Sequence, residues 1–495
     1  MAQHAWSADE QRSYAAGFAK TVTGNFIDGQ WTAAGSTDTI DVFDPSTGGV
    51  IGAVPASTAK DVEAAVAAAR AAQKAWSKTP PSARSQALLA VVAAVEEKFE
   101  EMVALEAIDA GKPVSAVRDD ELPGCLDAMR YFSSAGRTLS AQAGGDYLEG
   151  ITSVMRREPL GVVAGITPWN YPLLQAVAKI FPALITGNTV VIKPAETTPY
   201  STALLVQLAG EVLPAGVLNI VFGTGAVVGD ALSRHPEVDV VSFTGSIETG
   251  RKVGIAAADG IKKAVMELGG NSPVLVFADA DLPAAMDAIA GAGLYNTGQE
   301  CMSATRVIVQ DSVFDEFVAG LKERCAQFVV GDALNPRTTM GPLNSTAQLN
   351  RVIAKLENLP ESAEIVLGGK RATGDGYFLP PTIIVGADQE DEIVTEEIFG
   401  PVFTVQKFTD EPDALAKANG TRYGLASSVF TTNVGVATRV QNELDFGTVW
   451  VNNHLVFGPD LPVSGFGHSG IGTENAEAGF VEFTRVKHVM IDGRI

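Results

Sequence analysis

Five short β-branched runs constrain the fold of this chain more than any other feature of its sequence. They follow one another after Gly161, with helix-length segments between them, and read GVVAGITP, NTVVIKPA, LNIVFGTG, DVVSFTG and KAVMELGG. This alternation is typical of a parallel sheet with helices on both faces, whose ligands bind at the carboxyl ends of the strands. Similar runs recur between Ser272 and Phe430, so the sequence predicts a second α/β domain.

The balance of charges excludes several classes of partner. The chain has 36 Lys and Arg against 58 Asp and Glu, a formal net charge of -22, which repels nucleic acid and anionic lipid. Its most apolar region, residues 161–193, is interrupted by Pro168, Asn170 and Lys179, so we expect buried core there and not a membrane span. We therefore expect neither a nucleic-acid partner nor membrane association.

The cysteines indicate a reducing compartment. Cys125, Cys301 and Cys325 are too few and too scattered for a disulfide scaffold or a CxxC metal pair. The opening residues MAQHAWSADEQR lack the basic and apolar regions of a secretory signal. We expect a cytoplasmic protein with no metal site.

Two loop motifs suggest a nucleotide. In FTGSIETG, Ser246 follows a strand and precedes a helical pattern, so its side chain can cap a helix whose free N–H groups face a phosphate. In VIKPAETTP, Lys193 and Glu196 lie just past a strand end, where they could hold ribose hydroxyls, and the carboxylate would repel a 2′-phosphate. NAD is therefore favoured over NADP. The alternative for the second motif is a surface ion pair, and the glycine run FGTGAVVG alone is a weak signal.

Cys301 lies in NTGQECMSATR, among polar and small residues. This setting leaves open a reactive thiol or a residue of no consequence. A nucleophilic thiol in acyl transfer also needs an oxyanion donor and a base. PWNYP offers the amide of Asn170 and VMELGG offers the carboxylate of Glu267, although either residue alone could simply satisfy local backbone groups.

Taken together, the motifs resemble the aldehyde dehydrogenase superfamily, and the resemblance spans nearly the whole chain. The GDYLEGITSVMRREPLGVVAGITPWNYP and DDELPGCLDAMRYF segments are most similar to bacterial 4-aminobutanal dehydrogenases, which serve putrescine breakdown. The motifs that carry the resemblance are, in order, TPWNYP, GNTVVIKPAETTP, FTGSIETG, MELGGNSP, GQEC, EEIFGPV and SGFGHSGIG.

The resemblance implies NAD-dependent oxidation of an aldehyde to a carboxylic acid. Cys301 would attack the carbonyl to form a thiohemiacetal and then a thioester, and the Asn170 side chain with the Cys301 N–H would stabilise the oxyanion. Glu267 would activate the water that hydrolyses the thioester, which favours hydrolysis over transfer to coenzyme A. The alternatives are an enzyme with esterase activity only and a structural protein on the same scaffold.

The resemblance also implies how the cofactor is bound. Lys193 and Glu196 would bind the adenosine ribose, Ser246 would face the pyrophosphate, Glu397 would hold the nicotinamide ribose and Phe399 would pack near the ring. The whole set expected to bind NAD is Ile166, Thr167, Trp169, Lys193, Glu196, Gly225, Ser246, Leu268, Glu397 and Phe399.

The substrate tunnel predicted by the resemblance suits an aminoaldehyde such as 4-aminobutanal. A cationic amine favours acidic groups at the mouth and aromatic faces along the wall, and we expect Asp120 and Glu121 to overlook the entrance. Ala178 stands where many aminoaldehyde enzymes carry Trp, which predicts a wider tunnel. The positions expected to line the tunnel include no arginine clamp for an anionic aldehyde; betaine aldehyde and aliphatic or aromatic aldehydes are the alternatives. The residues expected to line the tunnel include Glu121, Tyr171, Gln175, Tyr295 and Phe457.

The superfamily fold implies three parts. The cofactor-binding domain, Rossmann-like, would comprise residues 1–141 and 161–264, and the α/β catalytic domain residues 265–473. A small β oligomerisation arm would comprise residues 142–160 and 474–495. We expect its segment EFTRVKHVMID to be an edge strand with no partner in its own chain, which would pair with a neighbour's sheet in a homodimer or homotetramer.

Overall fold

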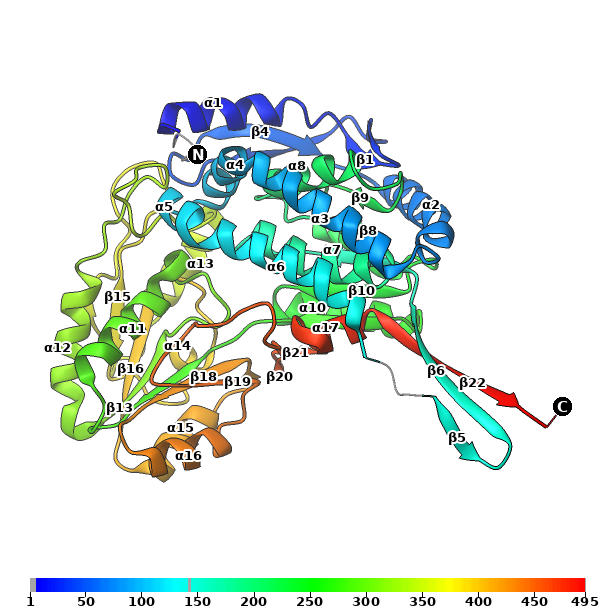
Figure 1. The fold of residues 1–495 in the computed structure, drawn as a ribbon. Helices are drawn as coiled ribbons and strands as arrows, with labels where there is room; N and C mark the ends of the chain where they lie inside the picture. The colour runs from blue at the N-terminus through cyan, green and yellow to red at the C-terminus, as the bar shows by residue number, and fades with distance from the viewer. Residues whose placement is uncertain (1–5, 141–143, 495) are drawn as a thin grey trace.

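The computed structural model describes residues 6–140 and 144–494, and it has two α/β lobes and a projecting arm (Figure 1). The first lobe is built on an eight-stranded sheet in the order β2-β1-β9-β8-β7-β10-β11-β21. Its five central strands are parallel, which confirms the βαβ pattern of the sequence. They are β7 (Val162–Ile166), β8 (Thr189–Lys193), β9 (Leu218–Ile220), β10 (Val240–Thr244) and β11 (Lys263–Glu267).

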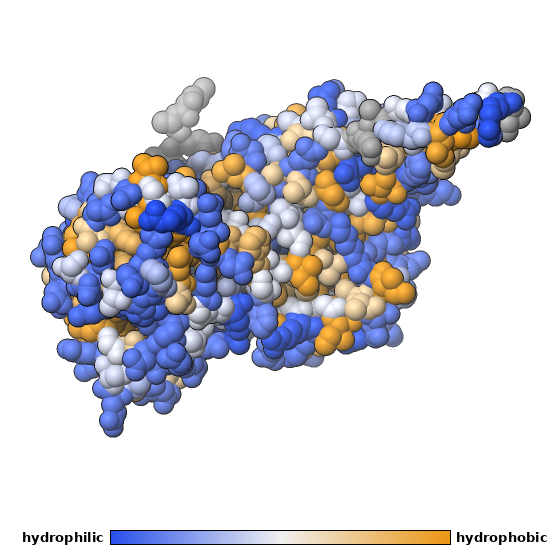
Figure 2. Space-filling view, turned by 90° about the horizontal axis from the view of Figure 1, so that it is seen from below, coloured by the Kyte–Doolittle hydropathy of each residue, from blue (hydrophilic) through white to orange (hydrophobic). Residues whose placement is uncertain are grey.

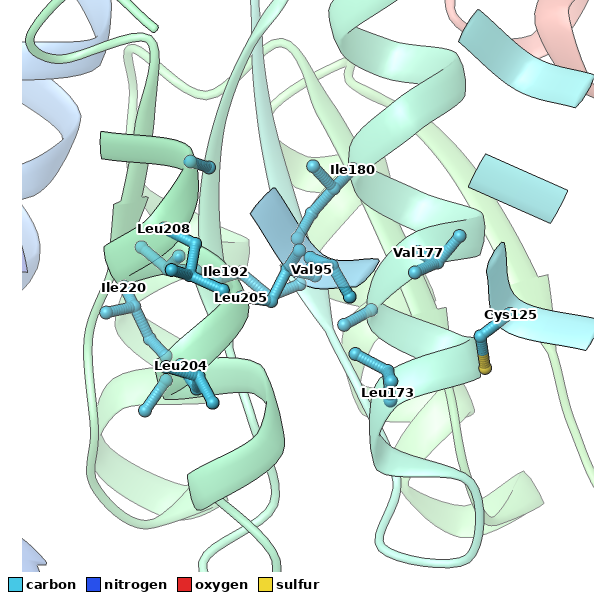
Figure 3. Close-up of a cluster of buried hydrophobic side chains, with 14 of the residues drawn as sticks. Val95, Cys125, Leu173, Val177, Ile180, Ile192, Leu204, Leu205, Leu208 and Ile220 are labelled. Carbon is cyan, nitrogen blue, oxygen red and sulfur yellow. The ribbon is translucent and has the colours of Figure 1, made fainter. Parts of the chain in front are cut away.

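The two faces of this sheet bury alternate side chains of the same strand. Val163 packs into a core shared with helices α7 (Pro172–Ile185) and α8 (Tyr200–Gly210), whereas Val162 packs on the other face with helix α2 (Ala59–Trp76). Figure 3 shows the first of these cores, with Val177 and Ile180 of α7 on one side and Leu205 and Leu208 of α8 on the other. Because successive side chains of each strand are buried on opposite faces, the strands are packed from both sides and their carboxyl ends are held in fixed positions.

The N-terminal region partly matches the sequence expectations. In NFIDGQW, residues 25–31, Asp28-Gly29 lies between apolar residues and predicts a two-residue hairpin. This prediction is confirmed between β1 (Asn25–Ile27) and β2 (Gln30–Thr32), with φ values of 54° and 79° at Asp28 and Gly29. The helical apolar spacing from Ala59 to Glu106, broken near Pro80-Pro81, predicts two helices, and this number was wrong by one. Three helices occur, because the chain leaves helical geometry at Lys98 (φ -104°, ψ 29°) as well as before Pro81. The two further helices are α3 (Pro81–Glu97) and α4 (Phe99–Ala110).

The second lobe contains the second α/β unit that the sequence predicts. Its seven-stranded sheet has the order β14-β15-β16-β13-β12-β18-β19, and all strands but β14 are parallel to their neighbours. The remaining strand of the first sheet, β21 (Gly470–Ile471), returns from this region and pairs with β11. The strands of the second sheet are β12 (Pro273–Val276), β13 (Arg306–Gln310), β14 (Glu364–Leu367), β15 (Thr382–Val385), β16 (Val402–Phe408), β18 (Ala426–Phe430) and β19 (Thr448–Val451).

The arm corrects one expectation. Strand β22 (Thr484–Asp492) is not without a partner in its own chain, because it pairs antiparallel with β6 (Ile151–Pro159) along its whole length, and β5 (Gly145–Leu148) completes the sheet. Local sequence patterns could not predict this pairing, because the two strands are separated by more than 300 residues. Among the residues that the structure describes, no strand pairs with the outer edge of β22. Hydrophobic side chains lie on the projecting arm (Figure 2), and Tyr147 and Met490 are 60% and 54% exposed.

Across the two described ranges, no helix is both long enough and apolar enough to cross a membrane.

Candidate active site

A cavity of about 610 Å³ brings together the three residues that the sequence proposes for catalysis. Asn170 lies in the loop between β7 and α7, Glu267 is the last residue of β11, and Cys301 follows a short 3-10 turn at Tyr295–Gly298. All three side chains line this cavity. Strand ends of the first sheet therefore face the cysteine loop of the second lobe, as expected for a site at carboxyl ends of parallel strands.

The loop before Cys301 has an unusual backbone. Asn296, Thr297 and Gly298 have φ values of 48°, 59° and 69°, a conformation that is costly for residues with a side chain. A Cβ atom at Gly298 would lie 2.2 Å from the carbonyl oxygen of Gly400. Glycine is therefore required at this position both for its conformation and for the close approach of a second chain segment.

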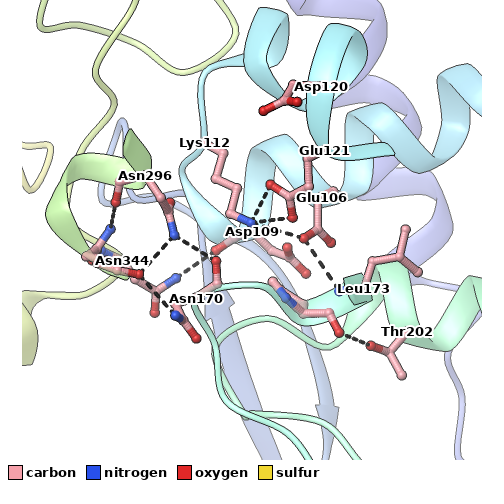
Figure 4. Close-up of polar contacts among 12 residues, drawn as sticks. Glu106, Asp109, Lys112, Asp120, Glu121, Asn170, Leu173, Thr202, Asn296 and Asn344 are labelled. Carbon is pink, nitrogen blue, oxygen red and sulfur yellow. Dashed lines mark hydrogen bonds and ion pairs between the residues drawn. The ribbon is translucent and has the colours of Figure 1, made fainter. Parts of the chain in front are cut away.

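Hydrogen bonds join the cysteine loop to the loop of Asn170. The Asn170 Nδ2 group donates to the carbonyl oxygen of Gln299 at 3.0 Å, and Asn296 Nδ2 donates to the carbonyl oxygen of Asn170 at 2.8 Å. Asn344 extends the network by donating its N–H to Gln299 Oε1 at 2.9 Å (Figure 4). The carboxamide of Asn170 carries a second N–H, so one bond fixes the side chain while the other N–H can serve an oxygen in the cavity.

Glu267 is a buried carboxyl group with an unused acceptor. The residue is only 6% exposed, and its Oε1 has no hydrogen-bond partner in the part of the chain that the structure describes. Burial, and then the charge of Glu474, raise the pKa of Glu267 well above its usual range, against the opposing effect of Lys179. Lys179 itself is paired with Glu474 at 2.8 Å. A carboxyl group of raised pKa binds a proton more readily than an ordinary Glu side chain, which suits a base that takes a proton from water in the cavity.

Cys301 is half-buried and has a carboxylate as its neighbour. Its Sγ lies 3.2 Å from Glu300 Oε1 in hydrogen-bonding geometry. Burial raises the pKa of the Cys301 thiol well above its usual range, and Glu300, Glu397 and Glu267 raise it further. The resting thiol is therefore neutral, and it needs a base when it attacks a carbonyl.

One group of the predicted cofactor residues lies at the carboxyl end of β8. Lys193 is buried and lies 3.4 Å from Glu196, which accepts a hydrogen bond from the Gly225 N–H at 2.5 Å. Burial lowers the pKa of Lys193. Thr167, at the end of the neighbouring strand β7, donates its N–H to the Lys193 carbonyl. One ammonium and one half-buried carboxylate at a strand end fit a ribose diol.

A second group of these residues lines the cavity itself. Ser246 caps helix α10 (Ile247–Asp259) by accepting the Thr249 N–H at 3.3 Å. Glu397 accepts the Gly270 N–H at 2.9 Å, and burial raises the pKa of Glu397 to about 7. Phe399 has a φ of 59° and stands perpendicular to Trp169, with ring centroids 5.3 Å apart.

The structure thus divides the predicted cofactor residues into two groups. Those that line the cavity are Trp169, Ser246, Leu268, Glu397 and Phe399. Those that lie outside its lining are Ile166, Thr167, Lys193, Glu196 and Gly225.

Glu121 does not overlook the cavity entrance as a free charge, and this expectation was wrong. It lines the cavity, but it is buried, and both carboxylate oxygens are paired with Lys112, at 2.5 and 2.6 Å (Figure 4). Burial raises the pKa of Glu121 to about 8. Lys112 also lies 3.9 Å from the centre of the Tyr171 ring, so the chain's own ammonium occupies one face of that ring. The exposed carboxylates among the lining residues are Asp127 and Asp120, and Asp120 accepts a hydrogen bond from the Tyr295 hydroxyl at 2.5 Å.

The rest of the predicted tunnel also lines the cavity. Tyr171 and Tyr295 are nearly parallel, at 11° and 6.5 Å between ring centroids, and Gln175 and Phe457 are further lining residues. Carboxyl groups greatly outnumber cations on this wall, where Arg351 is the one cationic side chain among the lining residues that the structure describes. The carboxyl-bearing lining residues are Asp120, Glu121, Asp127, Glu267, Glu300, Glu397 and Glu474.

Sequence reasoning missed His454, which also lines the cavity. Its ring nitrogens lie 2.6 Å from the Met302 carbonyl oxygen and 2.9 Å from Ser428 Oγ. Burial lowers the pKa of His454 to about 4, so the ring is neutral and supports the backbone beside the cysteine. Its place just after β19, in VNNHLVF, at the carboxyl end of a parallel strand, was the signal that could have found it.

Comparison with known proteins identifies relatives that match nearly the whole chain. The model of the aldehyde dehydrogenase family matches residues 31–489. A phenylacetaldehyde dehydrogenase of Pseudomonas fluorescens is 39% identical over 476 residues, covering 94% of this chain and 95% of the relative. An aldehyde dehydrogenase of Aspergillus niger is 40% identical over 472 residues, covering 94% of each. The crystal structure of a betaine aldehyde dehydrogenase from Staphylococcus aureus in complex with NAD+ superimposes with a TM-score of 0.94 at 37% identity, covering 98% of both chains.

Proposed function

The chain belongs to the aldehyde dehydrogenase family, and from that premise we propose that it oxidises an aldehyde to a carboxylic acid with NAD, using Cys301, Asn170 and Glu267. The observation that carries this proposal is that a thiol, an amide donor and a buried carboxyl group from distant parts of the chain line one cavity. No single one of these residues would suffice, because acyl chemistry needs a nucleophile, an oxyanion donor and a base together.

The proposed chemistry assigns one task to each group. Cys301 Sγ attacks the aldehyde carbonyl, and the free N–H of Asn170 with the Cys301 backbone N–H holds the oxyanion. When bound, NAD supplies the hydride acceptor that makes the conversion of thiohemiacetal to thioester an oxidation. Glu267 then takes a proton from water, which attacks the thioester and releases the acid.

The cofactor residues suit NAD. Lys193 and Glu196 would bind the adenosine ribose, with Gly225 alongside, while Ser246 would face the pyrophosphate and Glu397 the nicotinamide ribose. The Glu196 carboxylate would repel the 2′-phosphate of NADP. The Staphylococcus aureus betaine aldehyde dehydrogenase, which resembles this chain over 98% of its length, was crystallised with NAD+.

An aminoaldehyde such as 4-aminobutanal is the proposed substrate. The excess of carboxyl groups on the cavity wall favours a cationic end group and disfavours an anionic one. Lys112 is already paired with Glu121 and covers one face of the Tyr171 ring. The amine of the substrate would therefore bind nearer the mouth, between Asp120 and the Tyr295 ring.

An arylacetaldehyde is the second candidate. Phe132, Leu174 and Phe457 give the cavity apolar walls, and the Pseudomonas fluorescens relative is named for phenylacetaldehyde. An aromatic ring would gain from burial against these side chains.

A substrate panel tests the function and the substrate in one experiment. NADH absorbance would be followed with 4-aminobutanal, phenylacetaldehyde, propanal and succinate semialdehyde, each with NAD and with NADP. We expect turnover with NAD that disappears in Cys301→Ala, and the highest kcat/KM with 4-aminobutanal. A preference for phenylacetaldehyde would select the second candidate, whereas equal use of all four aldehydes would contradict both. Turnover that persists in Cys301→Ala would overturn the proposed function.

The arm would join copies of this chain into a homodimer or homotetramer. The open edge of β22 and the exposed Tyr147, Leu148 and Met490 of the same small sheet give a neighbouring copy both backbone groups and apolar surface to bury.

A further inference from the structure

Glu300, the residue before the nucleophile, makes a contact that the proposed mechanism does not use. Its Oε1 lies 3.2 Å from Cys301 Sγ and also accepts the Met302 N–H at 3.2 Å. The side chain is half-buried and lines the cavity. One bond to the backbone therefore fixes the carboxylate, and the other contact aims it at the reacting sulfur.

We propose that Glu300 is the base that takes the proton of the Cys301 thiol during attack on the aldehyde, which leaves Glu267 to activate water. The proposal rests on the function proposed above. The S–H bond breaks as its proton passes to Glu300 Oε1, the sulfur electron pair forms the C–S bond, and the carbonyl π pair becomes the oxyanion. The products are a thiohemiacetal anion and a protonated Glu300.

The geometry favours Glu300 over the other carboxyl groups that face the thiol. Glu397 is already held by the Gly270 N–H. Glu267 has no hydrogen bond from Cys301 in the described structure, and of the three carboxyl groups that act on the thiol it has the smallest effect. A general base must lie within hydrogen-bond reach of the proton that it removes, and Glu300 does so before any substrate is bound.

The charged surroundings explain why the base would act only during attack. The thiol is faced by Glu300, Glu397 and Glu267, and Glu300 in turn is close enough to Tyr171 and Tyr295 to raise the pKa of both hydroxyls. A full thiolate beside these carboxylates is unfavourable at rest. Transfer of the proton to Glu300 as the C–S bond forms avoids that state, because the negative charge moves to the oxyanion held by Asn170.

The alternative is that Glu300 only fixes the turn through the Met302 N–H, and Glu300→Gln separates the two roles. The amide oxygen of Gln can still accept that N–H, but it is a far weaker base. The substitution also removes a negative charge beside the thiol, so the pKa of Cys301 should fall. Alkylation by iodoacetamide, followed against pH without aldehyde or NAD, should therefore have its midpoint at lower pH in Glu300→Gln.

In Glu300→Gln the rate of attack on the aldehyde should fall, although alkylation of the thiol becomes easier. Positioned bases contribute roughly 10²–10⁴-fold, and since Glu267 lies in the same cavity we expect the pre-steady-state burst of NADH to slow by about 10- to 100-fold in Glu300→Gln. Easier alkylation with slower attack on aldehyde is the signature of a lost base. A parallel rise in both rates, or no change in either, would overturn the proposal.

Two further variants complete the test. Asp119→Asn removes a carboxylate from an exposed position that does not line the cavity, and both its burst and its alkylation profile should match those of the unsubstituted chain.

If Glu300→Gln does not fold, Glu300→Asp is used, which keeps a carboxylate one methylene further from the sulfur. Its burst should be slowed, with an alkylation midpoint close to that of the unsubstituted chain; an unchanged burst contradicts the proposal. Absence of any aldehyde-dependent NADH from the unsubstituted chain would instead refute the proposed function.

Discussion

At the scale of single residues, the most demanding of the proposed roles is that of Glu267. Glu267→Gln removes the proposed base while keeping the shape of the side chain, so we expect the thioester on Cys301 to form but not to hydrolyse. Steady-state turnover should fall by roughly 10²–10⁴-fold, and a burst of NADH should remain. Mass spectrometry of the trapped chain should show an acyl group on Cys301. Loss of the burst together with the turnover would show that Glu267 acts before the thioester.

The same substitution should alter how stability depends on pH. Because the pKa of Glu267 is raised in the folded chain, the folded state holds this proton more tightly than the unfolded state does. Proton binding by Glu267 therefore adds fully to the free energy of unfolding below the unfolded pKa of about 4.5. This contribution is lost as pH rises toward the folded pKa. We expect the free energy of unfolding of Glu267→Gln to fall less than that of the unsubstituted chain above about pH 4.5. Urea titrations at several pH values provide the measurement, and parallel curves would contradict it.

Lys112 offers a test of the buried ion pair. In Lys112→Met, the Glu121 carboxyl would lose its partner in a buried site, and Glu106, 3.4 Å from the same ammonium, would lose a second contact. Removing one member of a buried pair costs about 3–5 kcal/mol, measured as a lower free energy of unfolding in urea. The control is Lys355→Met, whose partner Glu392 is largely exposed, and which should cost no more than about 1 kcal/mol. Equal losses in the two variants would contradict this account.

Residue types in motifs predicted the three residues that the structure brings into one cavity, because the proposed chemistry requires a thiol, an amide and a carboxyl group. The partner of Glu121 could not be predicted in the same way. Lys112 precedes it by nine residues, and only the bend of the chain between α4 and the turn at Val117–Glu121 brings the two side chains together. A charge that sequence alone assigns to the substrate was therefore already neutralised within the fold.

At the scale of elements, the loop before Cys301 depends on Gly298. Gly298→Ala would place a methyl group against the Gly400 carbonyl in a left-handed backbone conformation, so the loop must move and the thiol with it. We expect a loss of at least about 2 kcal/mol in stability and a large fall in kcat. The control is Gly17→Ala in helix α1 (Ala8–Ala19), where no atom lies within 4 Å of the added methyl. That change should be neutral or stabilise by up to about 1 kcal/mol, and equal effects of the two substitutions would refute this role of Gly298.

Local patterns predicted elements well where a local cause forms them. The Asp28-Gly29 hairpin and the parallel strands after Gly161 follow from turn chemistry and from β-branched runs. The break at Lys98 has no such signal, because neither proline nor glycine stands there. The pairing of β22 with β6 is also invisible locally, since strand partners distant in sequence are chosen by tertiary packing.

At the scale of the whole molecule, the arm should hold copies of the chain together. Leu148→Asp combined with Met490→Asp places two charges on exposed positions of the small sheet, 58% and 54% exposed, without touching the cavity. We expect light scattering after size exclusion to show a smaller assembly than that of the unsubstituted chain. An unchanged mass would mean that the copies assemble through another surface.

The proposed oxidation requires that the cavity between the two lobes bring Cys301, Asn170 and Glu267 to one aldehyde beside bound NAD. This convergence is tested by a single-turnover reaction of Glu267→Gln with aldehyde and NAD, followed by mass spectrometry of its peptides. We expect one NADH per active chain and an acyl group on Cys301. NADH formed with no acyl group on the chain, or an acyl group on Cys125 or Cys325 instead, would contradict it.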